Sequence, residues 1–101
     1  MKVSILIPAR NEEKTISQCV QSCLNQSVKP DEIVVVNDGS TDKTKTILES
    51  FGNKIKLVNM YPNAGSKSRA QEKGLKHVTG DIYITTDADT VLEKNYIKNT
   101  I

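Results

Sequence analysis

Short apolar runs alternate along this chain with segments whose apolar residues recur at helical spacing. Val3–Ile7 (VSILI) and Ile33–Val36 (IVVV) are largely β-branched runs, typical of strands that are buried on both faces of a sheet. Between them, apolar residues stand three, four, seven and eight positions after Ile16, which is the spacing of an amphipathic helix. Strands that alternate with helices predict βαβ units and therefore an α/β fold with a parallel sheet.

The same alternation continues to the end of the sequence. A short second helix is expected to end at Gly52, and Lys54–Met60 (KIKLVNM) predicts a strand with one face in water, as at a sheet edge. A third helix is expected to end at Gly80 and a buried fourth strand to span Ile82–Thr86 (IYITT). The tail from Val91 to Ile101 has loosely helical spacing.

Capping residues predict where the helices begin. Asn11 is expected to cap a first helix that starts at Glu12, and Ser40 or Thr41 is expected to cap the second. Leu75 is expected on the apolar face of the third helix.

Crossover connections between parallel strands are right-handed, and the third strand, with one face in water, belongs at an edge of the sheet. Together these two constraints predict the strand order 3-2-1-4. The predicted fold class is a Rossmann-like, three-layer α/β/α architecture with a mainly parallel sheet. Its order reverses direction between the first and fourth strands, and ligands bind at such a reversal outside the carboxyl ends of the strands. The polar segments Pro8–Glu12, Asn37–Ser40 and Asp87–Asp89 follow those strands and are predicted to line one crevice.

The composition narrows the classes of partner. The sequence has 14 Lys and Arg against 12 Asp and Glu, and its arginines are only Arg10 and Arg69, which argues against a nucleic-acid polymer as partner. No apolar run approaches the roughly 20 residues of a membrane span. A cytoplasmic setting is expected, with the cytoplasmic face of a membrane, reached through segments outside this chain, as the alternative. Cys19 and Cys23 are interpreted as core thiols.

Asp87 and Asp89 are the strongest candidates for chemistry. They stand two residues apart after the fourth strand, so on an extended backbone both carboxylates project the same way. Such a pair can bind a hard divalent cation and leave coordination positions open for phosphate oxygens and water. The alternative is a solvated turn at the end of a strand.

Four more side chains are expected around the crevice, and each has a structural alternative. Asp38 either accepts a hydrogen bond from a ligand N–H group, such as a nucleobase imide, or forms an Asx turn. Arg10 and Glu12 either meet a nucleotide and its metal-bound diphosphate or lie solvated in the first turn of a helix. Lys67 either meets phosphate at a helix N-terminus or is a solvated surface residue.

Four segments occur in an order that resembles a known family. They are IPARNEE, IVVVNDGSTD, NAGSKSRAQEKGL and GDIYITTDADT. Together they resemble the N-terminal, nucleotide-binding half of family 2 glycosyltransferases of the GT-A fold, and the resemblance covers residues 2 to about 97.

The resemblance implies inverting transfer of a sugar from a UDP- or GDP-linked donor to an acceptor hydroxyl, with Mg²⁺ or Mn²⁺. Asp38 matches the position that recognises the base, Asp89 the metal ligand, and Asp87 its neighbour facing ribose or metal. The implied nucleotide-binding set is Pro8, Ala9, Arg10, Glu12, Asp38, Lys67, Asp87 and Ala88, and the implied metal set is Asp87 and Asp89.

Two positions depart from the family pattern. Arg10 stands where an aromatic residue often stacks on the base, and Gln71-Glu72 stands where many members have Asn at the second position. The family's general base and acceptor site lie in a second half, beyond residue 101. Residues 1–101 are therefore expected to form the donor-binding half, inactive alone, with its catalytic residue unknown.

A second reading keeps the nucleotide site without the chemistry. The chain is then a non-catalytic nucleotide-binding or interaction module that assembles with another chain. Nucleotidyltransferases of related fold rank lower, because the segment Pro8–Glu12 after the first strand contains no glycine.

Overall fold

Four strands form one sheet in the order β3-β2-β1-β4 in the computed structural model, which describes residues 1–101. Every neighbouring pair of strands is parallel, so the predicted order and direction are confirmed. The strands are β1 (Val3–Ala9), β2 (Glu32–Asp38), β3 (Lys56–Met60) and β4 (Ile82–Thr85).

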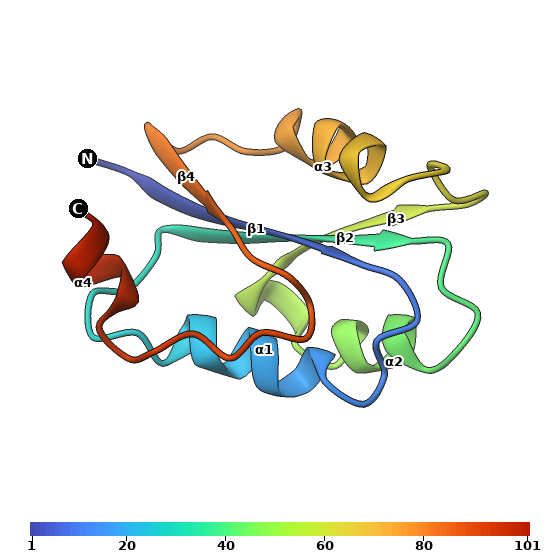
Figure 1. The fold of residues 1–101 in the computed structure, drawn as a ribbon, viewed down its shortest axis with the longest axis horizontal. Helices are drawn as coiled ribbons and strands as arrows, with labels where there is room; N and C mark the ends of the chain where they lie inside the picture. Colours follow the sequence, from blue (N-terminus) through green and yellow to red (C-terminus); the bar gives the residue numbers. More distant parts are fainter.

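Helices cover both faces of this sheet and complete three layers. In Figure 1, α1 and α2 lie on one side of the strands and α3 lies on the other. The predicted three-layer α/β/α architecture is therefore confirmed. The helices are α1 (Ile16–Leu24), α2 (Thr44–Glu49), α3 (Lys67–Leu75) and α4 (Tyr96–Thr100), with a 3₁₀ turn, η1, at Gly52–Lys54.

Alternate residues of the central strands build a core on each face. Ile5 and Ile7 of β1 belong to a large cluster that also contains the buried apolar side of α1, whereas Leu6 belongs to a small cluster with Val34 and Val36. Cys19 and Cys23 are free thiols within the large cluster, which confirms their interpretation as core residues. Because Cys23 is hydrogen-bonded to Cys19 and buried, its pKa is raised well above the usual range, and it keeps its proton.

Helix α3 approaches the small cluster through a glycine. A Cβ atom on Gly74 would lie 2.6 Å from Cγ2 of Val36 and 2.7 Å from Cδ1 of Leu6, so the helix backbone rests directly on the sheet. The prediction that Leu75 faces the core is wrong, because Gly74 occupies that place and Leu75 is 38% exposed.

Two predicted helix caps are also wrong. Helix α1 begins at Ile16, and Asn11 lies well before it in the left-handed region with φ of 52°. Oδ1 of Asn11 accepts a hydrogen bond from the backbone N–H of Thr41 at 2.7 Å, so Asn11 joins two loops. At α2 the N-cap position is Lys43 and not Ser40 or Thr41, and it makes no side-chain capping bond; Asp42, one residue earlier, accepts from the N–H of Thr44 at 2.9 Å.

The fourth strand is less buried than predicted. Only Ile84 of β4 is fully buried, and Tyr83 is 50% exposed. The physical reason is position, because β4 lies at an edge of the sheet and pairs only with β1. None of the helices has the length and apolar character needed to cross a membrane.

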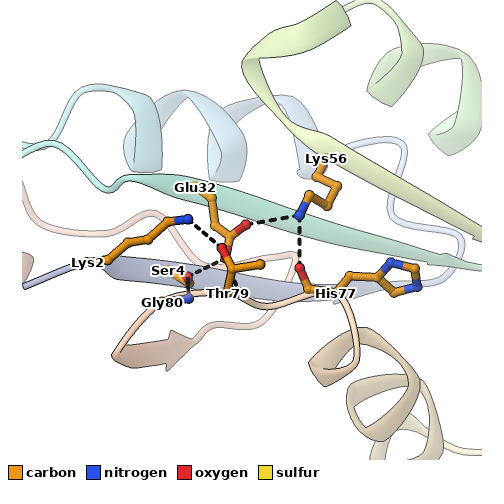
Figure 2. Close-up of polar contacts among 7 residues, drawn as sticks. All are labelled: Lys2, Ser4, Glu32, Lys56, His77, Thr79 and Gly80. Carbon is orange, nitrogen blue, oxygen red and sulfur yellow. Dashed lines mark hydrogen bonds and ion pairs between the residues drawn. The ribbon is translucent and has the colours of Figure 1, made fainter.

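A carboxylate ties the connection after α3 to the start of β2. Figure 2 shows Glu32 receiving hydrogen bonds from Ser4, Thr79 and Lys56, from three separate parts of the chain. Burial would raise the pKa of Glu32, but the hydrogen bonds from Ser4, Thr79 and Lys56 outweigh it and lower the pKa to about 2. The cluster fixes the amino-terminal end of the sheet, opposite the polar loops.

Candidate functional site

The polar loops after β1, β2 and β4 meet the start of α3 in one open crevice. Its volume is about 290 Å³, near the lower end of the range for small-molecule sites. It lies at the carboxyl ends of the strands, where the strand order reverses between β1 and β4. Its lining residues are Pro8, Ala9, Arg10, Glu12, Asp38, Ser66, Lys67, Ala70, Asp87, Ala88 and Asp89. Every residue of the implied nucleotide-binding and metal sets lies at the crevice, and the role of each as a ligand contact stays a prediction. The predicted lining segments were too long, because Asn11, Asn37, Gly39 and Ser40 do not line it.

The loop after β1 forms one wall and is held by the loop after β2. Arg10 is exposed and Glu12 is partly buried at the crevice. The backbone N–H of Asn11 donates to Oγ of Ser40 at 3.0 Å, and that of Glu12 donates to Oγ1 of Thr44 at 2.9 Å. These bonds place Arg10 and Glu12 beside the end of β2.

Asp38 lies at the floor of the crevice and is 5% exposed. Its Oδ1 atom accepts a hydrogen bond from the backbone N–H of Ala64 at 2.6 Å, whereas Oδ2 has no partner within the chain. The turn continues through Gly39 with φ of 67°, and a Cβ atom there would lie 2.8 Å from Cβ of Asn63. Glycine is thus required at position 39 both by its backbone conformation and by the close approach of the loop after β3.

Asp87 and Asp89 reach the crevice from the segment after β4. Both are exposed, and Ala88 between them is buried at 4% exposure. The extended backbone predicted for this pair is wrong, because residues 88–89 form a turn that the N–H of Thr90 closes on the carbonyl of Asp87 at 3.0 Å. Two carboxylates suit a hard cation such as Mg²⁺ or Mn²⁺, whose remaining positions would be filled by water and phosphate oxygens. No group of three or more His, Cys, Asp or Glu residues could hold a metal in this chain. The donor set therefore fits a cation shared with a ligand.

Lys67 spans the opening from α3. Its ammonium forms an ion pair with Oδ1 of Asp87, and each side chain is 56% exposed. The helix begins directly before it, where the side chain of Ser66 accepts from the backbone N–H of Arg69 at 3.2 Å. Lys67 is thus a solvated side chain with one ion-pair partner, and its contact with phosphate stays a prediction.

Two lining residues and one backbone group were not predicted. Ser66 has a sequence signal, because a serine before a helix is a common N-cap. Ala70 is 1% exposed beneath the crevice, and its small size lets α3 lie close to the sheet. The N–H of Ala64 has no sequence signal, since a backbone donor is present in every residue except proline.

A parallel sheet covered by helices on both faces, with a polar crevice at its reversal point, defines a Rossmann-like α/β protein. The family model described as "Glycosyl transferase family 2" matches residues 4–101, and the chain belongs to that family.

Three relatives illustrate the match. The chain is 42% identical to "Probable glycosyltransferase YdaM" of Bacillus subtilis over 92% of its length, which is 24% of that protein. It matches the crystal structure of Staphylococcus aureus TarS in complex with UDP-GlcNAc with a TM-score of 0.89 and 32% identity, over 99% of this chain and 30% of that one. It matches the mannosyltransferase PcManGT from Pyrobaculum calidifontis, in complex with GDP-Man and Mn²⁺, with a TM-score of 0.76 and 29% identity, over 87% of this chain and 27% of that one. The chain thus spans less than a third of each of these relatives.

Proposed function

We propose that this chain binds the donor of an inverting glycosyltransferase, a nucleoside diphosphate sugar, together with Mg²⁺ or Mn²⁺. The observation that carries the proposal is the convergence of Asp38, Asp87 and Asp89 on one crevice at the reversal point of the sheet. The relatives solved with UDP-GlcNAc, and with GDP-Man and Mn²⁺, support the class of ligand.

Each charged group has a role that follows from its place. Asp38 accepts a hydrogen bond from the base, and Asp87 and Asp89 hold the cation. The cation, when bound, neutralises the diphosphate and stabilises it as a leaving group. Lys67 and Arg10 add positive charge at the two sides of the crevice, where Lys67 meets phosphate and Arg10 lies against the base or the diphosphate.

The state of Asp38 favours uracil over guanine. Guanine presents two adjacent N–H donors that use both oxygens of a carboxylate, whereas uracil presents a single imide N–H. In this structure Oδ1 already accepts from Ala64 at 2.6 Å and Oδ2 accepts from no group of the chain, so Oδ2 is the oxygen with both lone pairs open to a ligand. A UDP-linked donor therefore fits this crevice better than a GDP-linked one.

Sugar transfer itself requires more than the donor site. The acceptor hydroxyl must be held near the anomeric carbon and lose its proton to a base within hydrogen-bond reach. In this proposal the acidic residues at the crevice have other roles: Asp38 contacts the nucleobase, Asp87 and Asp89 hold the cation, and Glu12 accepts from Thr15. We propose that residues 1–101 are the donor-binding half, that the base and acceptor site belong to a further half, and that the chain acts in the cytoplasm, where its two free thiols stay reduced.

Calorimetry with UDP and GDP, in Mn²⁺ and in chelator, tests the donor site. Tighter binding of UDP in Mn²⁺ than in chelator is expected, with GDP weaker than UDP. Equal affinity in both conditions would contradict the cation role of Asp87 and Asp89. Binding of neither nucleotide would favour the non-catalytic interaction module instead.

A further inference from the structure

A stripe of polar side chains along α1 holds the segment that carries Asp87 and Asp89. The stripe consists of Thr15 at the N-cap of α1, Cys19 and Ser22 on the helix, and Gln26 just after it, at successive spacings of four, three and four residues. Each of them forms a hydrogen bond with the backbone of residues 87–97.

Two members of the stripe act directly beneath the carboxylates. Oγ1 of Thr15 donates to the carbonyl oxygen of Ala88 at 3.2 Å, and Sγ of Cys19 donates to the carbonyl oxygen of Asp87 at 3.4 Å. The same Asp87 carbonyl also accepts from the backbone N–H of Thr90 at 3.0 Å, which closes a turn.

The other two members anchor the chain further on. Oγ of Ser22 accepts from the N–H of Leu92 at 2.9 Å. Gln26, 1% exposed, donates to the carbonyl of Glu93 at 2.7 Å and accepts from the N–H of Ile97 at 3.0 Å. These contacts lie away from the crevice, so they bear on stability.

The segment needs such support because residues 86–95 belong to neither a helix nor a strand. No ladder of backbone bonds fixes its peptide planes beyond β4. With the carbonyls of Asp87 and Ala88 bonded to α1, the carboxylates of Asp87 and Asp89 are left on the exposed side, at the crevice. Loss of the Thr15 hydroxyl leaves the Ala88 carbonyl without a partner, and loss of the Cys19 thiol leaves the Asp87 carbonyl held by the Thr90 N–H alone. Either loss loosens a peptide plane and alters the spacing of the two carboxylates.

Thr15 also connects the segment with the loop after β1. Its Oγ1 atom lies 3.2 Å from Oε2 of Glu12 as well as 3.2 Å from the Ala88 carbonyl. One hydroxyl proton is shared between two acceptors, so the position of Glu12 and that of Ala88 depend on each other.

We propose that Thr15 and Cys19 are positioning residues that set the Asp87 and Asp89 carboxylates at the spacing a divalent cation requires. This inference rests on the proposed function, in which those carboxylates hold the cation. Neither residue touches the ligand, and both act through the backbone of residues 87–88.

The experiment compares pairs of variants that differ in a donor. Thr15→Val removes the hydroxyl and keeps the shape, and Thr15→Ser keeps the hydroxyl. Cys19→Ala removes the thiol, and Cys19→Ser keeps a donor. Ser22→Ala serves as the control, because it removes a stripe contact remote from the carboxylates. For each variant, calorimetry gives the ratio of UDP affinity in Mn²⁺ to that in chelator, and electron paramagnetic resonance records the bound Mn²⁺.

Thr15→Val and Cys19→Ala should each lower the ratio about fivefold, the effect of one net hydrogen bond. UDP affinity in chelator should be unchanged in Cys19→Ala, whereas Thr15→Val, which also frees Glu12, should lower it in chelator and lower it further in Mn²⁺. The serine variants should keep the ratio, and Ser22→Ala should lower the melting temperature alone. An unchanged ratio in Thr15→Val and Cys19→Ala overturns the inference, even if both melt earlier. If Cys19→Ala does not fold, Thr15→Val decides alone. A ratio of one in the unmodified protein would overturn the cation role first, and the inference with it.

Discussion

The ammonium of Lys67 and the carboxylate of Asp87 form an ion pair that links α3 to the segment after β4 across the crevice. The pair occupies a carboxylate that the proposed cation would need. Because both side chains are 56% exposed, water screens the pair and little free energy is lost when it breaks. If the proposed cation binds Asp87, Lys67 is expected to leave that carboxylate and to meet the diphosphate instead.

Lys67→Met should change the affinity for Mn²⁺ and the affinity for UDP in opposite directions. Mn²⁺ alone should bind several-fold more tightly, since the competing ammonium is gone, and UDP with Mn²⁺ should bind several-fold more weakly, since a phosphate contact is lost. Titrations of Mn²⁺ and of UDP measure both. Lys73→Met, an exposed change on the same helix, is the control and should alter neither. A Lys67→Met protein with unchanged Mn²⁺ affinity would show that the ion pair does not compete.

Asp38→Ala should lower the affinity for UDP more than it lowers the stability of the fold. A hydrogen bond between a charged acceptor and the base contributes about 1.5–3 kcal/mol, so UDP affinity should fall roughly 10- to 100-fold. Asp42→Ala is the matched control, because it removes the bond to Thr44 at the start of α2 and should cost about 1 kcal/mol of stability with no loss of affinity. Calorimetry and thermal melting on both variants separate the two effects. Unchanged UDP affinity in Asp38→Ala would mean that the carboxylate only holds the Ala64 loop.

Glu32 should make folding stability depend on pH. Its pKa in the folded protein is about 2, below the ordinary value of 4.5, so its stabilisation is complete above about pH 4.5 and is lost as the pH falls toward 2. The side chain is 11% exposed, and the stabilisation is on the order of 2–3 kcal/mol. Urea unfolding of the native protein and of Glu32→Gln between pH 2 and 7 gives the difference at each pH. That difference should shrink toward pH 2, and a difference that stays constant would contradict the assignment.

Gly74→Ala should destabilise the protein although alanine is the better helix former. Its Cβ atom would lie 2.6 Å from Val36 and 2.7 Å from Leu6, both buried, and such overpacking costs about 1–3 kcal/mol. Lys73→Ala on the exposed side of α3 should change the free energy of unfolding by less than about 0.5 kcal/mol. Chemical denaturation compares the two. Greater stability in Gly74→Ala would show that α3 can move away from the sheet.

The layers and strand order could be predicted because they depend on which strands are buried, and the pattern of apolar and polar residues indicates that burial. The runs VSILI and IVVV can only be central strands, and the alternating Lys residues before Leu57 mark an edge. The site could be placed because the carboxyl ends of parallel strands meet at one edge of the sheet.

The errors come from contacts between distant segments. Asn11 has a side chain that often caps helices, but its side-chain oxygen Oδ1 accepts a hydrogen bond from the backbone N–H of Thr41 on the neighbouring loop. Leu75 stands five positions after Ala70, so on a helix it projects away from the buried side that Ala70 and Gly74, four positions apart, share. The bonds from Thr15 and Cys19 to residues 87–88 join positions about 70 residues apart, a pairing that helical periodicity does not encode.

Glu32 and Asp38 begin and end the same strand, six residue steps and therefore about 20 Å apart. One end of β2 belongs to the hydrogen-bonded cluster of Figure 2 and the other to the crevice. Selection for tolerance of acid or heat can act on Ser4, Lys56 and Thr79 without altering the residues that meet a ligand. In the same way, substitutions at Arg10 and Asp38 that change the preferred donor can occur without disturbing the Glu32 cluster. Homologues adapted to different habitats should therefore differ at the first set while keeping the second.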